Sequence, residues 1–152
     1  MLNMKKIASI LICIAMLFGC SPAKDSGMDI HTFSIGKADC SLLSFDGINV
    51  LIDTGEDDDG DDIVRELKNL RVEKLDLVIL TKGPDGSEVI TSNQVIPQGT
   101  DDVEIVDTVG AGDSFTAAFV VSYLRGDTLT QAQRLASKTA SYVCSRKGAM
   151  PQ

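Results

Sequence analysis

A glycine-rich turn between a predicted strand and a predicted helix restricts the fold of this 152-residue chain more than any other feature. The predicted strand is Val103–Val106, the turn spans Asp107–Asp113, and Phe115 begins the apolar face of the helix. Such a turn presents free backbone N–H groups at the positive end of a helix dipole, where they can bind an anion such as phosphate. A tight turn with a purely structural role is the alternative, since one Gly-x-Gly pattern is a weak signal.

Segments with strand and helix periodicity alternate along the chain, which predicts the α/β fold class. A first strand starts at Met28, and further strands are predicted at residues 41–45, 49–52, 75–80, 88–90 and 94–96. Asp46-Gly47, between two of these strands, is a strong signal for a two-residue hairpin. Thr128 and Gln131 have the spacing of a capping box, which predicts the start of the last helix.

The acidic run Asp57–Asp62 has two interpretations. As the start of a helix, it places carboxylates at the positive end of the dipole, and Ile63, Leu67 and Leu70 follow as one apolar stripe. As a calcium loop, it would need the spaced acidic pattern and the closing glutamate of an EF-hand, and it has neither. We therefore predict a helix that starts in this run.

The first twenty residues have the pattern of a secretory signal. Lys5-Lys6 precedes an apolar run at residues 7–18, which is shorter than the about 20 residues that span a bilayer. The run ends at Leu17-Phe18-Gly19-Cys20, which resembles the lipobox of bacterial lipoproteins, whose cysteine is acylated. This resemblance implies membrane attachment through a lipid on Cys20, a tether at residues 21–27 and an extracytoplasmic location. A buried N-terminal helix is the alternative.

Composition excludes several kinds of site. Lysine and arginine number 14 against 22 acids, a net charge of −8, so the chain lacks the basic face of a nucleic-acid binder. His31 is the only histidine, which excludes zinc sites that need two or more. With Cys13 and Cys20 assigned to the signal, Cys40 and Cys144 remain, and no metal-type spacing joins them. We interpret both as plain thiols.

Residues 28–81 resemble the start of a metallo-β-lactamase-fold hydrolase of the competence-protein-like kind. The matching segments are the strand from Met28, then Asn49–Gly55 and Leu75–Thr81. In that family the last strand leads into an HxHxDH loop of zinc ligands, whereas Thr81 is followed here by Lys82-Gly83-Pro84-Asp85-Gly86. Asp53 alone cannot hold a catalytic zinc that needs three protein ligands. The resemblance therefore implies a module without zinc.

The glycine turn and its helix, Asp107–Val120, resemble the C-terminal signature of the PfkB (ribokinase-like) family of carbohydrate kinases. Thr81–Gly86 matches the T-x-G-x-x-G nucleotide loop of that family, and Ser145–Pro151 matches the loop after its last helix. The bacterial fructokinase-like members look most similar. The resemblance covers residues 81–152 and implies phosphoryl transfer from ATP, carried with Mg²⁺, to a sugar hydroxyl.

The same resemblance implies a role for each matching residue. Asp113 would be the general base that takes the proton of the sugar hydroxyl. The anion hole for the transferring phosphate would be Gly110, Ala111 and Gly112. The nucleotide would lie against Thr81, Gly83, Gly86 and Ser137. A monovalent cation, K⁺, would be bound mostly through main-chain carbonyls at Asp107, Val109, Val143, Arg146 and Gly148.

We therefore predict an incomplete ribokinase-like unit at residues 81–152 after a partial metallo-β-lactamase-like ββαβ unit at residues 28–80. A fusion of two gene fragments at Thr81 would explain why the resemblance passes from one family to the other at this residue. A single divergent protein is the alternative. The sugar-binding part of a kinase has no match in the chain, so transfer would be weak or absent. A kinase segment alone would be cytoplasmic, and this location conflicts with the export that the signal at residues 1–20 predicts. The second hypothesis for function is a non-catalytic lipoprotein module of the metallo-β-lactamase fold.

Overall fold

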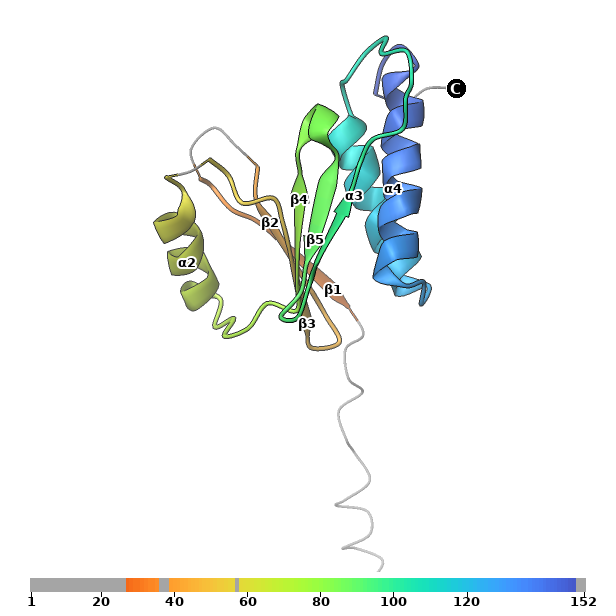
Figure 1. Ribbon diagram of the computed structural model, residues 1–152. Coiled ribbons are helices and arrows are strands. Elements are labelled where there is room, and N and C mark those ends of the chain that lie inside the picture. Colours follow the sequence, from red (N-terminus) through yellow and green to blue (C-terminus); the bar gives the residue numbers. More distant parts are fainter. Residues whose placement is uncertain (1–26, 36–38, 57, 150–152) are drawn as a thin grey trace, which may run out of the picture.

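Six short strands form one mixed sheet. The computed structural model describes residues 27–35, 39–56 and 58–149. The strands of this sheet (Figure 1) are β1 (Met28–Thr32), β2 (Ser41–Phe45), β3 (Ile48–Ile52), β4 (Leu77–Thr81), β5 (Ser87–Ile90) and β6 (Val95–Gln98). They lie in this order across the sheet. The β3–β4 pair is parallel and the other described pairs are antiparallel. The predicted hairpin around Asp46-Gly47 is confirmed as the β2–β3 connection.

The parallel β3–β4 pair lies in the middle of the sheet, and β4 then pairs with β5, the first strand after Thr81. Val50 lies opposite Leu77 and Ile52 opposite Ile79. A parallel pair needs a crossover connection, and α2 (Gly60–Asn69) provides it. The predicted helix start in the acidic run is thus confirmed. Residues on both sides of Thr81 belong to the same sheet, because β4 continues into the antiparallel strand β5.

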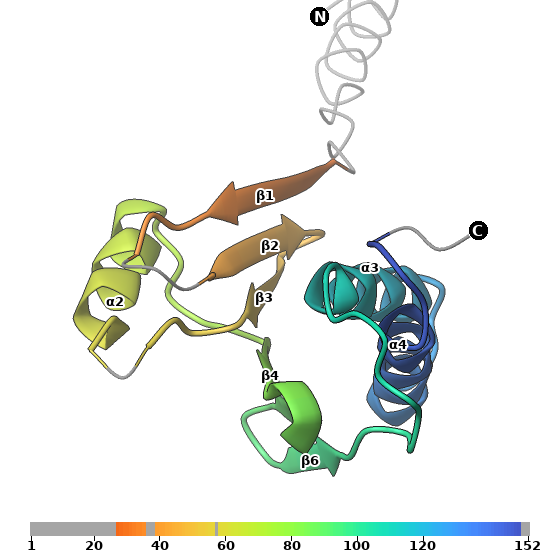
Figure 2. The ribbon, with the colours of Figure 1, turned by 90° about the horizontal axis from the view of Figure 1, so that it is seen from above.

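Helices cover both faces of the sheet (Figure 2). The helix α2 lies on one face, and α3 (Ala111–Leu124) and α4 (Leu129–Cys144) lie together on the other. Along β3, Val50 and Ile52 belong to the core beneath α3 and α4, whereas Leu51 belongs to the core beneath α2. A strand buried on both sides needs a continuous apolar run, which explains the composition of β3 and β4.

The larger core contains residues from both parts of the chain. Leu43, Ile52 and Ile79 pack in one cluster with Phe115 and Phe119 of α3. Phe119 is 1% exposed, and its ring centroid lies 6.5 Å from that of Phe115, within the range of favourable aromatic pairs. The two parts therefore share a core.

The capping box predicted at Thr128 begins α4. Thr128 Oγ1 accepts a hydrogen bond from Gln131 N, and Thr128 N donates to Gln131 Oε1, which completes the capping box. Gly126, with a φ of 91°, follows the end of α3. A short connection, residues 125–128, thus joins α3 to α4.

The predicted strand at Val103–Val106 is wrong. The segment is irregular, and Ile105 and Val106 are 62% and 56% exposed. The backbone N–H of Val106 donates to Cys144 O at the end of α4, so its hydrogen bond goes to a helix end and not to a strand. After β6 the chain leaves the sheet to reach α3, and no neighbouring strand in the described chain pairs with this apolar run.

Several predictions fall on residues outside the described ranges. They are the signal at residues 1–20 with Cys20, the tether up to residue 26, and residues 150–152 of the terminal loop. Within the described ranges, no helix has both the length and the apolar character that a membrane span requires.

A shared core predicts one cooperative unfolding transition for the described part of the chain. We expect Ile52→Val in β3 and Phe119→Leu in α3 to destabilise the fold by about 1 kcal/mol each, because both remove buried carbon atoms. In urea unfolding followed by circular dichroism, both variants should move the same transition. Ile30→Val is the control, since Ile30 is 59% exposed. Two transitions, each moved by one variant, would contradict a shared core.

Candidate functional site

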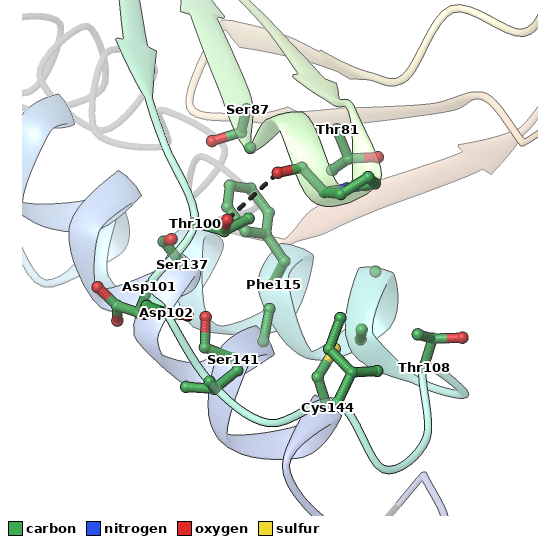
Figure 3. A pocket seen from close by; sticks show the side chains of 18 residues that line it. Thr81, Ser87, Thr100, Asp101, Asp102, Thr108, Phe115, Ser137, Ser141 and Cys144 are labelled. Carbon is green, nitrogen blue, oxygen red and sulfur yellow. Dashed lines mark hydrogen bonds between the residues drawn. The ribbon is translucent and has the colours of Figure 1, made fainter.

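A cavity of about 790 Å³ opens where the loop after β4 meets the ends of α3 and α4 (Figure 3). Its walls come from four stretches: Thr81, Gly83, Pro84, Gly86 and Ser87; Thr100–Val103 and Ile105; Thr108, Ala111, Gly112 and Phe115; and Ser137, Ala140, Ser141 and Cys144. The predicted nucleotide loop, two residues of the predicted anion hole and Ser137 therefore meet at one cavity. Gly110 and Asp113 are not among the lining residues.

The loop Thr81–Gly86 is closed by its own backbone. Lys82 N donates to Gly86 O at 2.8 Å, and the 3-10 turn η1 (Gly83–Asp85) fills the interval. Gly86 has a φ of 90°, and a Cβ atom there would lie 2.0 Å from the backbone oxygen of Gln98 in β6. Glycine is required at position 86 because the neighbouring strand passes so closely.

The start of α3 is an uncapped helix N-terminus with open space in front of Gly112. Gly110 has a φ of 79°, and a Cβ there would lie 2.7 Å from Ala149 Cβ. A Cβ on Gly112 would meet nothing within 4 Å. No side chain caps the helix, and the backbone N–H groups of Gly112 and Asp113 make no hydrogen bond within the described residues. Free N–H groups and the positive end of the dipole therefore face a space that a phosphate could fill.

Asp113 lies in the first turn of α3, next to Gly112. Its side chain is exposed, and it makes no hydrogen bond or ion pair with another described residue. The carboxylate therefore has no partner among the described residues, and it follows Gly112, which lines the cavity. Its role as a general base stays a prediction.

Two polar residues of α4 donate hydrogen bonds to β5, to β6 and to the loop after β6. Ser137 Oγ donates to Gly99 O at 3.1 Å, after the end of β6. Gln133, which is 1% exposed, donates from Nε2 to Ser87 O, Ser87 Oγ and Ile96 O at 3.0 to 3.2 Å. Sequence reasoning missed Gln133. The sequence does hold a signal for it: an amide side chain stands in the apolar stripe between Ala132 and Ala136, where a buried polar group needs hydrogen-bond partners.

Asp101 and Asp102 are further lining residues that sequence reasoning missed. They are the only charged side chains among the lining residues, so the walls described here carry negative charge and no cation. Lys82 does not compensate, because it is not in the lining and its Nζ pairs with Glu88 Oε1 at 2.6 Å. A bound phosphate would therefore depend on backbone N–H groups and on any metal that it carries.

The residues predicted for a monovalent cation are brought together in part. Asp107 accepts hydrogen bonds from Val109 N and Gly148 N, both at 3.0 Å, and these bonds lower the pKa of its carboxyl. Val143 O accepts from Arg146 N at 3.0 Å. Asp107 thus connects the loop before α3 to the loop after α4. The described residues hold no group of three or more histidine, cysteine or acidic side chains that could bind a metal ion.

A second polar group lies at the carboxyl end of β3. Asp53 accepts hydrogen bonds from Thr81 N at 2.7 Å and from Thr81 Oγ1 at 2.9 and 3.0 Å. Burial raises the pKa of Asp53, and the bonds from Thr81 oppose that effect. Burial also raises the pKa of Cys40 to about 11, with smaller contributions from the charges of Asp53 and Asp59. Cys40 is therefore an inert buried thiol.

Residues 45–152 match the family described as pfkB family carbohydrate kinase. Among curated proteins, a nucleoside kinase of Methanothermobacter thermautotrophicus is 34% identical over 128 residues, which are 82% of this chain and 40% of that protein. The fructosamine kinase FrlD of Bacillus subtilis is 36% identical over 73 residues, 48% of this chain and 26% of that protein. The chain thus spans about a quarter to two-fifths of the length of these relatives.

Solved structures agree with the family match. The Methanocaldococcus jannaschii nucleoside kinase, described as an archaeal member of the ribokinase family, superposes with a TM-score of 0.50 at 29% identity, over 60% of this chain and 34% of that one. The Arabidopsis thaliana ribokinase complexed with ribose and ATP superposes with a TM-score of 0.50 at 29% identity, over 64% of this chain and 32% of that one. The fold is therefore α/β and ribokinase-like with a mixed sheet.

The family match extends across the boundary predicted at Thr81. It begins at Phe45 and so includes β3, α2 and β4. The resemblance of residues 28–81 to the metallo-β-lactamase fold stays a prediction, together with the fusion at Thr81.

The two described cysteines should react very differently with iodoacetamide. Cys144 lines the cavity and is partly exposed, whereas Cys40 is fully buried and its pKa is about 11. At about pH 8, where a thiol with so high a pKa stays protonated, we expect labelling of Cys144 and not of Cys40. Peptide mass spectrometry gives both rates in one sample. Faster labelling of Cys40 than of Cys144 would contradict the burial described here.

Proposed function

Because this chain belongs to the pfkB family of carbohydrate kinases, we propose that its cavity binds ATP for phosphoryl transfer to a hydroxyl group. The observation that carries this proposal is the meeting of the loop Thr81–Gly86, the open start of α3 and Ser137 around one cavity. The family match and the ribokinase relatives support it.

The transferring phosphate would bind at the start of α3. The N–H groups of Gly112 and Asp113 have no partner among the described residues, and a Cβ on Gly112 would meet nothing within 4 Å. Phosphoryl transfer needs charge stabilisation at the transferring group, and backbone N–H groups that are already oriented supply it without rearrangement. Since the lining offers no cation, Mg²⁺ bound with the nucleotide would supply the remaining positive charge.

Asp113 would act as the general base. Its carboxylate would accept the proton of the acceptor hydroxyl as the hydroxyl oxygen attacks the γ-phosphorus. The bond from that phosphorus to the bridging oxygen would break, and ADP would leave. The exposed, unpaired carboxylate beside the anion site supports this role. For K⁺, the clustering of Asp107, Val109 and Gly148 supports a structural ion near the same loop.

The acceptor would be a sugar or the sugar of a nucleoside, as the names of the relatives suggest. The chain corresponds to a minor part of those proteins, so we propose nucleotide binding with little transfer by the chain alone. We also propose export and lipid attachment at Cys20 from the signal pattern of residues 1–20.

Gly112→Val should abolish nucleotide binding without unfolding the chain. A side chain at position 112 meets no protein atom but would occupy the space before the free N–H groups. In thermal unfolding, Mg-ATP at a hundredfold excess over its dissociation constant should stabilise the unmodified chain by about 2.7 kcal/mol, and Gly112→Val should lose this effect. Gly60→Val is the matched control, because Gly60 also begins a helix in open space. If Mg-ATP stabilised Gly112→Val and Gly60→Val equally, the nucleotide would bind elsewhere.

Asp113→Asn should separate binding from chemistry. The variant keeps the shape of the side chain but cannot accept a proton, so Mg-ATP affinity should stay within about twofold while any phosphoryl transfer to a sugar falls by about 10²-fold or more. Transfer is measured as sugar-dependent ADP formation with the full chain. Unchanged transfer in Asp113→Asn would rule out this base.

A further inference from the structure

Asp53 connects β3 to the first residue of the loop that lines the cavity. Its backbone N–H donates to Ile79 O at 2.8 Å, which continues the β3–β4 ladder past the end of β3. Its carboxylate accepts from both the N–H and the hydroxyl of Thr81. The backbone direction at Thr81 and the rotamer of its side chain are thus fixed by one residue.

The conformation of Asp53 suits this task. Its φ is 55°, in the left-handed region that aspartate and asparagine tolerate better than most residues. The side chain is partly buried, and burial raises the pKa of its carboxyl. Hydrogen bonds to a carboxylate that is shielded from water are strong and directional, so the Asp53–Thr81 contact is a rigid one.

Thr81 is held from the opposite side as well. It pairs with Ser87 in the β4–β5 ladder, and Ser87 O and Oγ accept the amide of Gln133 from α4. Thr81 and Ser87 both line the cavity. This wall is therefore held between Asp53 on one side and α4 on the other.

We infer that Asp53 is a positioning residue for nucleotide binding, which holds the loop Thr81–Gly86 in its binding conformation through Thr81. The inference rests on the proposed nucleotide site. A loop that is ordered before binding does not have to be ordered by the ligand, so the affinity is higher. The segment before Thr81 would thus contribute to a site whose predicted residues all come from Thr81 onward.

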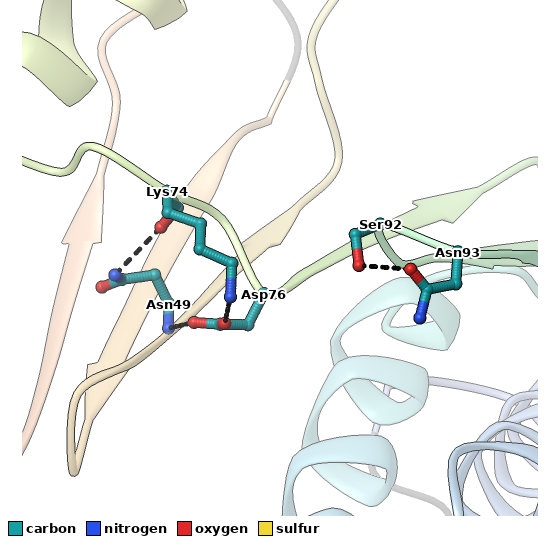
Figure 4. A network of polar contacts seen from close by, with 5 residues as sticks. All are labelled: Asn49, Lys74, Asp76, Ser92 and Asn93. Atoms are coloured by element: carbon teal, nitrogen blue, oxygen red, sulfur yellow. Dashed lines mark hydrogen bonds and ion pairs between the residues drawn. The ribbon is translucent and has the colours of Figure 1, made fainter.

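The chain offers a matched control at the other end of the same two strands (Figure 4). Asp76 Oδ2 accepts from Asn49 N at 3.0 Å, and Asp76 Oδ1 pairs with Lys74 Nζ at 2.6 Å. Asp76 therefore links β3 and β4 just as Asp53 does, but it is not among the residues that line the cavity. Loss of either carboxylate weakens the strand pair, and only loss of Asp53 should affect the loop.

The test measures Mg-ATP affinity of the full chain by calorimetry in five variants. Asp53→Gly removes the carboxylate and tolerates the left-handed backbone, and Asp76→Gly is its control. Thr81→Val removes the hydroxyl at nearly constant shape, whereas Thr81→Ser keeps it. We expect about tenfold weaker binding in Asp53→Gly and Thr81→Val. Asp76→Gly should stay within about twofold, Thr81→Ser should bind Mg-ATP more tightly than Thr81→Val, and the Asp53→Gly/Thr81→Val double variant should lose no more than Asp53→Gly alone.

Equal losses of affinity in Asp53→Gly and Asp76→Gly would overturn the inference, as would normal affinity in Thr81→Val. Hydrogen exchange of the backbone N–H groups of Lys82, Gly83, Asp85 and Gly86 separates this inference from the proposed function. Faster exchange in Asp53→Gly than in Asp76→Gly supports positioning even if the unmodified chain binds no nucleotide, a result that would refute only the proposed function. Equal exchange in the two variants refutes positioning.

Discussion

The parallel pairing of β3 with β4 is the constraint on which the rest of the structure depends. It places Ile52 and Ile79 side by side beneath α3 and α4, and it brings the ends of both strands to the same edge of the sheet. In α/β sheets, ligands bind beyond the carboxyl ends of the strands. Thr81 ends β4 at that edge and lines the cavity, with Asp53 bonded to it from the end of β3.

The charges around the cavity limit which groups could attract an anionic ligand. The chain has a net charge of −8, and Asp101 and Asp102 add negative charge to the lining. An anionic ligand must therefore be attracted locally, and the free N–H groups of α3 are the source that the described residues provide. The glycines have distinct functions in this arrangement. Gly86 and Gly110 permit close approaches within the protein, whereas Gly112 leaves space for a ligand.

Local patterns could be predicted from the sequence, and contacts between distant residues could not. The hairpin at Asp46-Gly47 and the capping box at Thr128 depend on residues within four positions of each other, so their chemistry is visible in the sequence. The bonds from Thr81 to Asp53 and from Gln133 to Ser87 span 28 and 46 residues. They depend on the order of the strands, which no short pattern encodes.

The errors have the same physical origin. Residues 103–106 have the composition of a strand, but a strand also needs a neighbour, and this segment bonds to the end of α4 instead. The change of sequence character predicted at Thr81 stays a prediction, and the family match runs across this residue from Phe45 onward. The glycine and threonine motifs that line the cavity could be found in the sequence because each of them is short. Asp101 and Asp102 were missed since they belong to no such motif.

The most direct test of the central claim is a titration of the ¹⁵N-labelled full chain with Mg-ATP, followed by NMR of the backbone N–H groups. If the triphosphate binds at the start of α3, the signals of Gly112 and Asp113 should shift most, together with those of Gly83 and Gly86. The signals of α2 on the other face of the sheet should stay in place. Saturable shifts that leave Gly112 and Asp113 unchanged would contradict the account, and so would the absence of any shift.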